Sequence, residues 1–373
     1  MKSLYSSHSR KSPTPARNPR QPRRRLALER LEDRTLLSAI TVTTFDDVVD
    51  PLDGLTSLRE AVSLAATLAD ADTIHLPRMI DGTSNLYRLS LGQIEINDTS
   101  GKLTIQGEAG PTAIFAAPNS RHFTVGATSE VELNSIGLGY GVADYGGAIQ
   151  NWGNLTLRSS AIYESEATAW GGGVYNSGTL TMISTDISNN KANGRGGGLF
   201  NNGTVQMLVC GIQWNRAGDG FGGGIDHNSG SLTVSDSYIA YNTAATGGGI
   251  NATSATTIQF TTFVGNLADT GGGLVLGNFV EATLSYCMFT SNAAQGQGGG
   301  VYNDATTSIT DTTFRQNSAD RGGGYFNSAY GSTTFLNGVF EDNKSGANGG
   351  AILSDGGSVS MTNVPLKIGR AHV

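Results

Sequence analysis

The sequence predicts an all-β protein, a single-stranded right-handed parallel β-helix that begins near Thr41 and carries a short N-terminal capping helix. Two observations predict this fold: a glycine-marked repeat of roughly 25 residues, and a second mark at a fixed distance from the glycines. Between the marks, apolar and polar residues alternate as they do in half-buried strands. The chain has 52 glycines but 9 prolines in 373 residues, so its glycines indicate neither collagen nor a proline-rich disordered chain.

The first mark is a Gly-Gly pair followed by one residue and then, in most copies, an aliphatic residue. Successive pairs are 24 to 27 residues apart. The second mark is an apolar residue three positions before an asparagine, as in Ile239 and Asn242. The first glycines of the pairs are Gly146, Gly171, Gly196, Gly222, Gly247, Gly271, Gly298, Gly322 and Gly349.

Coils with one common period can stack at about 4.8 Å per step, which aligns equivalent side chains in ladders along the axis. We expect one buried phenylalanine ladder and one asparagine ladder in a turn, because asparagine tolerates the left-handed conformation. The glycine pairs should lie where the chain bends tightly or takes a positive φ. The ladder residues are Phe263, Phe289, Phe314 and Phe340, and Asn242, Asn266, Asn292, Asn317 and Asn343.

Both marks together resemble the repeat of the polymorphic outer membrane protein family over residues 134–362. The resemblance implies a pectate-lyase-like solenoid that is displayed on a bacterial surface, in the outer membrane or outside the cell, and that acts in adhesion.

Ahead of the repeats, Ser57 and Glu60 have the spacing of a capping box, and Leu58, Ala61, Val62 and Ala65 would form one apolar face of a short helix. Such a helix can cover the exposed first coil of a solenoid. The segment resembles the SLREA-type domain that precedes some β-helices. We therefore interpret residues 40–140 as the cap with the first irregular coils, and residues 141–366 as regular coils.

The first 34 residues carry ten Lys or Arg and three Asp or Glu, whereas the remainder carries 14 and 28. The acidic body has no basic stripe for nucleic acid. Residues 1–39 are interpreted as a basic disordered leader, and residues 25–39 resemble an export motif of planctomycete surface proteins; a solvated helix is the alternative. No apolar run is long enough for a transmembrane helix. Residues 367–373 break both marks, and we expect them to be a non-native, adapter-derived tail on a truncated chain.

The best local cluster for chemistry is Asp219 with Asp226 and His227, on either side of one glycine pair. Because no other coil repeats these residues, we expect exposed polar residues on a turn and assign no catalytic residue, metal or cofactor. Asp236 and Asp311 share a repeat position but are separated by three coils, about 14 Å, which exceeds the spacing of glycosidase carboxylates.

Cys210 and Cys287 are also three coils apart at one repeat position, so both should be free, inward-facing thiols. Many coils without a convergent catalytic group favour an exported surface protein that binds a polysaccharide or another surface protein through a flank of Thr, Ser, Asn and Tyr residues. The alternatives are a polysaccharide lyase or glycoside hydrolase of the β-helix type, and a structural spacer.

Overall fold

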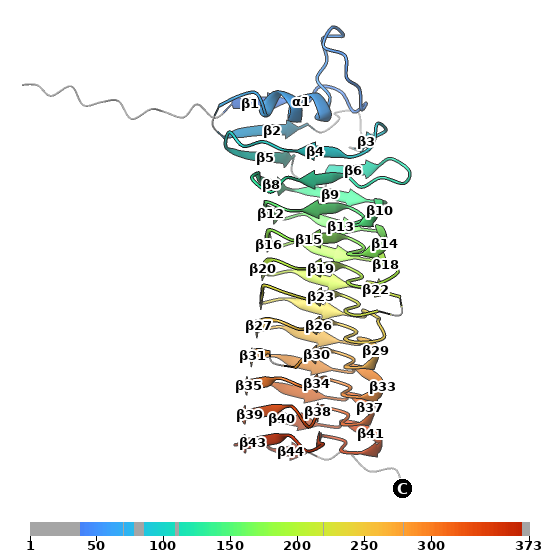
Figure 1. Ribbon diagram of the computed structural model, residues 1–373, viewed down its shortest axis with the longest axis vertical. Coiled ribbons are helices and arrows are strands. Elements are labelled where there is room, and N and C mark those ends of the chain that lie inside the picture. The colour runs from blue at the N-terminus through green and yellow to red at the C-terminus, as the bar shows by residue number, and fades with distance from the viewer. Residues whose placement is uncertain are drawn as a thin grey trace, which may run out of the picture. The chain divides into compact units, whose positions relative to one another are not determined.

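The computed structural model describes residues 38–69, 71–77, 86–108, 112–218, 220–278 and 280–367. These residues form a parallel β-helix in which each coil adds one strand to each of three long sheets (Figure 1). One short helix, α1 (Leu58–Ala65), precedes the coils within this described part. The prediction of an all-β parallel β-helix with one N-terminal helix is confirmed.

Sheet A contains 13 strands, most of them five residues long, with two inward-facing side chains in each. Its strands are β1 (Ser38–Thr41), β2 (Asp72–Leu76), β5 (Lys102–Gly107), β8 (Glu130–Asn134), β12 (Asn154–Arg158), β16 (Thr179–Ile183), β20 (Thr204–Leu208), β24 (Ser231–Ser235), β27 (Ala255–Gln259), β31 (Glu281–Ser285), β35 (Thr306–Thr310), β39 (Ser332–Leu336) and β43 (Ser358–Thr362).

Sheet B contains 12 strands, and from β13 onward most have three residues, of which only the middle one faces inward. Its strands are β3 (Leu86–Leu89), β6 (Thr112–Ala116), β9 (Ile136–Gly139), β13 (Ala161–Tyr163), β17 (Asp186–Ser188), β21 (Gly211–Gln213), β25 (Tyr238–Ala240), β28 (Thr262–Val264), β32 (Met288–Thr290), β36 (Thr313–Arg315), β40 (Val339–Glu341) and β44 (Leu366–Lys367).

Sheet C contains 11 strands and follows the glycine pairs. Its strands are β4 (Ile94–Ile96), β7 (Phe123–Val125), β11 (Ile149–Asn151), β15 (Val174–Asn176), β19 (Leu199–Asn201), β23 (Ile225–His227), β26 (Ile250–Ala252), β30 (Leu274–Leu276), β34 (Val301–Asn303), β38 (Tyr325–Asn327) and β42 (Ile352–Ser354).

Two four-stranded sheets lie in the segment between sheets B and C. The first contains β10 (Val142–Tyr145), β14 (Glu166–Trp170), β18 (Lys191–Ala192) and β22 (Arg216–Ala217), and the second contains β29 (Leu267–Thr270), β33 (Ala293–Gln297), β37 (Ser318–Arg321) and β41 (Lys344–Asn348).

The interior is a set of side-chain ladders, of which the phenylalanine ladder of sheet B has the largest rings. Phe263, Phe289, Phe314 and Phe340 are fully buried, and successive ring centroids are 4.5, 5.1 and 4.6 Å apart. Their planes differ by 4° to 11°. Because parallel register repeats the same side chain at nearly the strand spacing, each ring is covered by the ring of the next coil.

A buried asparagine ladder runs continuously from Asn190 to Asn343. Asn266 is typical: its Nδ2 donates to Asn292 Oδ1 and to the Ile239 carbonyl, both at 2.9 Å. Its Oδ1 accepts from both the main-chain N and the Nδ2 of Asn242 at 3.0 Å. The amide therefore satisfies buried main-chain groups that the turn leaves without partners.

The expectation that these asparagines take the left-handed conformation is wrong. The positive φ belongs to the residue before each of them, for example Tyr241 before Asn242 and Ser291 before Asn292. The left-handed residue points outward, which lets the asparagine side chain turn inward to its partners. The first glycine of each pair, in contrast, has a φ of 63° to 70°, a region that glycine reaches without steric cost.

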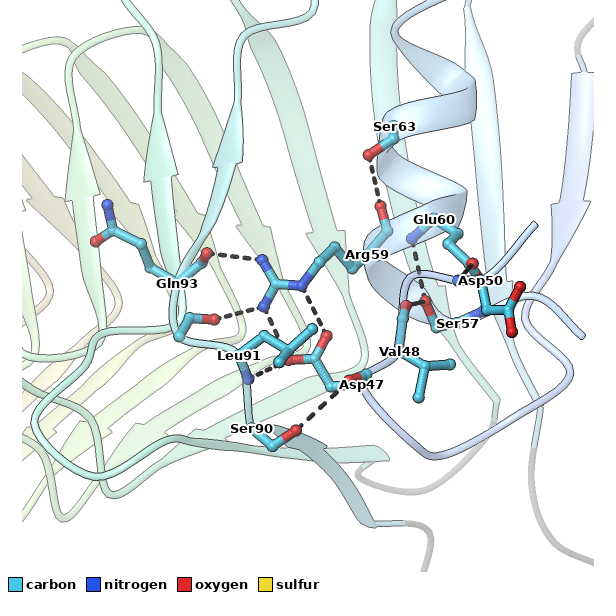
Figure 2. Close-up of polar contacts among 11 residues, drawn as sticks. Asp47, Val48, Asp50, Ser57, Arg59, Glu60, Ser63, Ser90, Leu91 and Gln93 are labelled. Carbon is cyan, nitrogen blue, oxygen red and sulfur yellow. Dashed lines mark hydrogen bonds and ion pairs between the residues drawn. The ribbon is translucent and has the colours of Figure 1, made fainter. Parts of the chain in front are cut away.

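The capping helix α1 begins at Ser57, whose hydroxyl accepts from Glu60 N, and the Glu60 carboxylate accepts in return from Ser57 N (Figure 2). Its apolar face, with Leu58, Ala61 and Val62, is buried against the first coils. This capping box and apolar face are those that the sequence predicts.

Sequence reasoning assigned no role to Arg59, which ties the cap to the coils. Its guanidinium contacts the Asp47 carboxylate through two hydrogen bonds of 2.8 Å and donates to the carbonyls of Gly92 and Gln93 (Figure 2). Asp47 also accepts from Leu91 N at 2.7 Å. A carboxylate whose side chain is 2% exposed is thus neutralised and hydrogen-bonded, as burial of a charge requires.

We predict that Arg59→Ala lowers the free energy of unfolding by about 3 kcal/mol, because it leaves the buried Asp47 carboxylate without its cation. Arg158→Ala is the control: Arg158 is 41% exposed and shares Glu132 with Lys102, so its loss should cost less than about 1 kcal/mol. Urea denaturation followed by circular dichroism measures both. Equal losses would contradict the role of Arg59.

We predict that Asn266→Ala costs about 2–4 kcal/mol, since it leaves the Ile239 carbonyl and the Asn242 amide groups buried without partners. Asn154→Ala, an exposed strand residue, should change stability by less than about 0.5 kcal/mol. The same denaturation measurement tests the pair, and a small loss for Asn266→Ala would show that the ladder does not hold the turn.

Candidate binding surface

Of the cluster expected from the sequence, the structure describes Asp226 and His227, and it does not bring their side chains to one surface. Asp226 and His227 are adjacent in β23, and both are fully buried. Because neighbouring residues of a strand point to opposite faces, their side chains cannot act on one bound group. The expectation of exposed residues on a turn is wrong for both, and Asp219 lies outside the described residues.

Asp226 faces outward from sheet C but is covered by Arg195, whose Nε is 2.6 Å from Asp226 Oδ2. Arg195 itself lies over the rings of Phe200 and Phe221, and Asn251 donates to Asp226 Oδ1 at 2.7 Å. Burial raises the pKa of Asp226 to about 6, opposed by the hydrogen bond from Asn251 and by the Arg195 charge. Both carboxylate oxygens therefore face partners inside the structure, and the carboxylate is not open to solvent.

His227 faces inward and occupies a position that asparagine holds in earlier coils. Asn151 and Asn176 each donate to the next asparagine at 2.7 Å, and Asn201 contacts His227 Nδ1 at 2.9 Å. His227 Nε2 lies 3.2 Å from the Ala255 carbonyl, so Nδ1 accepts and Nε2 donates. Burial lowers the pKa of His227 to about 4. This neutral imidazole continues a second asparagine ladder, which sequence reasoning missed although an asparagine follows many of the glycine pairs at one spacing.

The remaining candidates lie on separate coils. Cys210 and Cys287 are buried and free, each in the turn before a sheet B strand, and burial raises the pKa of the Cys287 thiol to about 11. Asp236 and Asp311 occupy equivalent left-handed turn positions with φ of 51° and 49°, three coils apart. Among the described residues no group of three or more His, Cys, Asp or Glu could hold a metal ion.

We predict that His227→Asn makes the protein more tolerant of acid. In the unfolded chain the imidazole binds a proton near pH 6.5, whereas in the folded chain it does so only near pH 4. The stability that the neutral His227 contributes is therefore fully present above pH 6.5 and is lost as the pH falls towards 4. Urea titrations at pH 7.5 and 5.0 measure the loss in the free energy of unfolding between these two pH values. This loss should be about 2 kcal/mol smaller for the variant than for the wild type. The raised pKa of Asp226 has the opposite effect, because it favours the folded state as the pH falls below 6. Asp226 is present in both proteins, so its contribution cancels in the comparison. Equal losses would contradict the neutral imidazole.

The outer face of sheet B carries the exposed aromatic residues of four successive coils. Trp214 stacks on Tyr241 with centroids 4.3 Å apart, and Phe260 stacks on Tyr286 at 4.9 Å. The four side chains are 56%, 40%, 51% and 55% exposed, respectively. Trp214 and Tyr241 follow their strands, whereas Phe260 and Tyr286 precede theirs. Together with Tyr238, which lies between the two pairs, these residues are called the aromatic face.

These rings occupy backbone positions that suit them poorly. All four residues of the stacked pairs have a φ between 48° and 58°, a conformation that costs a non-glycine residue about 1–2 kcal/mol. A stacked pair returns only about 0.5–1.5 kcal/mol. Equivalent positions hold asparagine or glycine in some coils, as at Asn189 and Gly265, but also Glu164, Ser184 and Val209. A positive φ therefore recurs at these turns whatever the residue. What distinguishes this region is that large rings are exposed on neighbouring coils, and clustered exposed apolar side chains are typical of functional sites.

Beside Phe260, on the outer face of sheet B, lies an open hollow of about 460 Å³. Gly211 forms part of its floor, where neighbouring strands carry side chains, and Tyr238, Phe260 and Gln213 line it. A Cβ at Gly211 would meet Asp186 Oδ1 at 2.4 Å, so the Asp186 carboxylate leans over the floor. This volume is in the range of small-molecule sites, roughly 300–1,000 Å³, and we call it the Gly211 hollow.

Polar groups around the Gly211 hollow are positioned to hydrogen-bond a ligand. Asp186 and Asp236 are both exposed at its edge, and Tyr238 also lines it. The sequence indicated a binding flank of Thr, Ser, Asn and Tyr residues without locating it, and it did not single out the rings of the aromatic face. The signal was present, because Trp214 and Tyr241 precede two ladder asparagines, while Phe260 and Tyr286 precede two sheet B strands.

Comparison with known proteins gives one short match. Residues 337–355 match the Chlamydia polymorphic membrane protein (Chlamydia_PMP) repeat. This segment contains Phe340, Asn343 and the Gly349–Gly350 pair, so it includes both marks of the repeat. No curated protein and no solved structure matches the chain significantly. The described part of the chain has no helix that is long and apolar enough to cross a membrane. The matched repeat and the β-helix fit a surface protein.

Proposed function

We propose that this protein is an exported surface β-helix that binds a polysaccharide on the aromatic face, without catalysis. The observation that carries the proposal is the pair of exposed ring stacks, Trp214 with Tyr241 and Phe260 with Tyr286, together with the Gly211 hollow that Phe260 lines. The matched surface-protein repeat supports a location at the bacterial surface.

Each ring pair covers its two inner faces and leaves outer ring faces and ring edges exposed. An exposed ring face suits a sugar, whose pyranose faces are apolar and whose edges carry hydroxyl groups. Each aromatic side chain offers a large apolar area with little conformational entropy to lose. The amide of Gln213 and the carboxylates of Asp186 and Asp236 lie beside the rings to receive hydroxyl groups. Since each coil repeats the geometry at about 4.8 Å, neighbouring sugars of one chain can contact rings on successive coils.

The outer face favours a polysaccharide over an extended peptide. Peptides that add to β-proteins do so along a free strand edge, through main-chain hydrogen bonds. On this face the strands β21, β25, β28 and β32 are each paired on both sides within sheet B, so their main-chain groups are occupied. The recognition that remains is through side chains, which suits ring stacking.

The catalytic alternative, a lyase or glycoside hydrolase, has less support at this surface. Acid catalysis on sugars relies on a carboxyl group that is shielded from water so that it holds its proton near neutral pH. Asp186 and Asp236 are both solvent-exposed. The buried carboxylate Asp226 is paired with Arg195 on a different sheet. These observations favour binding over catalysis. Analysis of the products after incubation with polysaccharides distinguishes the two functions.

We predict that the double variant Trp214→Asn, Phe260→Asn binds a soluble polysaccharide at least tenfold more weakly than wild type, about 1.4 kcal/mol, because one ring of each stack is lost. Asparagine suits the left-handed backbone, so the variant should unfold at the same urea concentration as wild type or a higher one. Affinity electrophoresis against a panel of neutral, acidic and amino polysaccharides, followed by calorimetry with the best binder, measures the effect.

The matched control is Gln316→Asn, at a position equivalent to Trp214 but four coils further on and outside the stacks. It should bind like wild type. Wild-type affinity in the double variant would contradict the proposal, and new reducing ends or unsaturated products after incubation would support the enzymatic alternative instead.

A further inference from the structure

The Gly211 hollow carries negative charge and no positive charge. The residues that line it include Asp186 and Asp236 but no lysine or arginine. Neither carboxylate forms an ion pair within the described part of the chain. On the same sheet, Arg315 is paired with Glu341 several coils further on. A ligand in the hollow therefore meets two uncompensated carboxylates.

The two carboxylates approach the hollow from different coils. Asp186 lies on β17, one coil before Gly211, and its Oδ1 occupies the space that a Cβ at Gly211 would need. Asp236 lies in the turn before β25, one coil after Gly211. Because coils are about 4.8 Å apart, the carboxylates flank the floor along the axis, roughly two coil steps from one another.

Aromatic rings complete the surroundings of the hollow. Tyr238 and Phe260 line it, and Trp214 directly follows Gln213, another lining residue. An organic cation is attracted both by carboxylates and by the faces of aromatic rings. Acidic sugars would be repelled by the same two carboxylates, which gives discrimination by charge as well as by contact.

We propose that the Gly211 hollow selects sugar units that bear a free, protonated amino group, so that the ligand of the aromatic face is a polysaccharide containing unacetylated amino sugars. This inference rests on the proposed glycan-binding function and specifies its ligand. The ammonium group lies between Asp186 and Asp236 over the Gly211 floor, while neighbouring sugar rings of the chain stack on Trp214 and Phe260.

The test compares three oligosaccharides of equal length by calorimetry at pH 6.5, where most amino groups with a pKa near 7.7 carry a proton. They are a glucosamine oligomer, an N-acetylglucosamine oligomer and a galacturonic acid oligomer, and an oligolysine of equal charge is a fourth probe. We expect the glucosamine oligomer to bind at least tenfold more tightly than each of the others, and its binding to weaken when NaCl is raised from 50 to 500 mM.

Three variants localise the effect. Asp186→Asn and Asp236→Asn should each weaken glucosamine binding severalfold and weaken N-acetylglucosamine binding much less, because the asparagine oxygen still accepts from a hydroxyl group. Gly211→Ala should do the same by displacing the Asp186 carboxylate, and the fold tolerates it because Ala161 occupies the equivalent position on β13. The control Asp311→Asn alters the turn position equivalent to Asp236 three coils away and should bind both oligomers like wild type.

The outcomes separate this inference from the function on which it rests. Equal binding of the charged and acetylated oligomers, or unchanged glucosamine binding in the aspartate variants, overturns the amino-sugar ligand but leaves polysaccharide binding intact. Tighter binding of oligolysine overturns the glycan as occupant in favour of a basic protein. Failure of every oligosaccharide to bind overturns both proposals.

Discussion

Each asparagine amide in the ladder from Asn190 to Asn343 depends on the identical amide one coil away. Asn266 is the clearest case, because its Nδ2 donates to Asn292 while its Oδ1 accepts from Asn242. A buried amide without partners costs several kcal/mol, so every coil along the ladder must present an asparagine at the same height. That requirement fixes the register of the turn, and the turn in turn fixes the register of the strands on either side. The phenylalanine stacks of sheet B follow from the same register.

Chain length can vary only where this constraint is absent. The apolar residue of sheet B always lies three positions before its asparagine, since both face the interior across one left-handed residue. The connection between sheets C and A is free to vary: two residues separate Asn176 from Thr179, whereas four separate Asn327 from Ser332. The variation of the repeat between 24 and 27 residues therefore arises partly outside the ladders, at the surface, where added residues disturb no buried partner.

The period of the sequence determines the coils, the inward side chains and the capping helix, because all three depend on local patterns that recur or on a capping box. Reasoning from the period failed for Asp226 and His227. In the sequence, residues that depart from the repeat resemble an exposed turn, because the strands of the coil cannot yet be placed. In the structure His227 replaces an asparagine of an inner ladder. Asp226 is shielded by Arg195, which comes from the preceding coil. Partners that are 26 to 31 residues apart have no local signature. The aromatic face was missed for a related reason: its rings lie on four coils and at two different turn positions, so no single repeat column contains them.

The register of the ladders also explains why the residues with a positive φ are suited to carry a binding surface. Their side chains point outward and have no partner in the ladders, so they can change without loss of buried hydrogen bonds. An asparagine or glycine there favours the backbone, as at Asn189 and Gly265; an aromatic ring is unfavourable for the backbone and gives the coil only a stack with its neighbour. Trp214, Tyr241, Phe260 and Tyr286 each adopt this less favourable arrangement, and Phe260 borders the hollow where Gly211 removes a side chain from the outer face. Stability does not require that coincidence of strained rings, a missing side chain and unpaired carboxylates, whereas recognition of a ligand does.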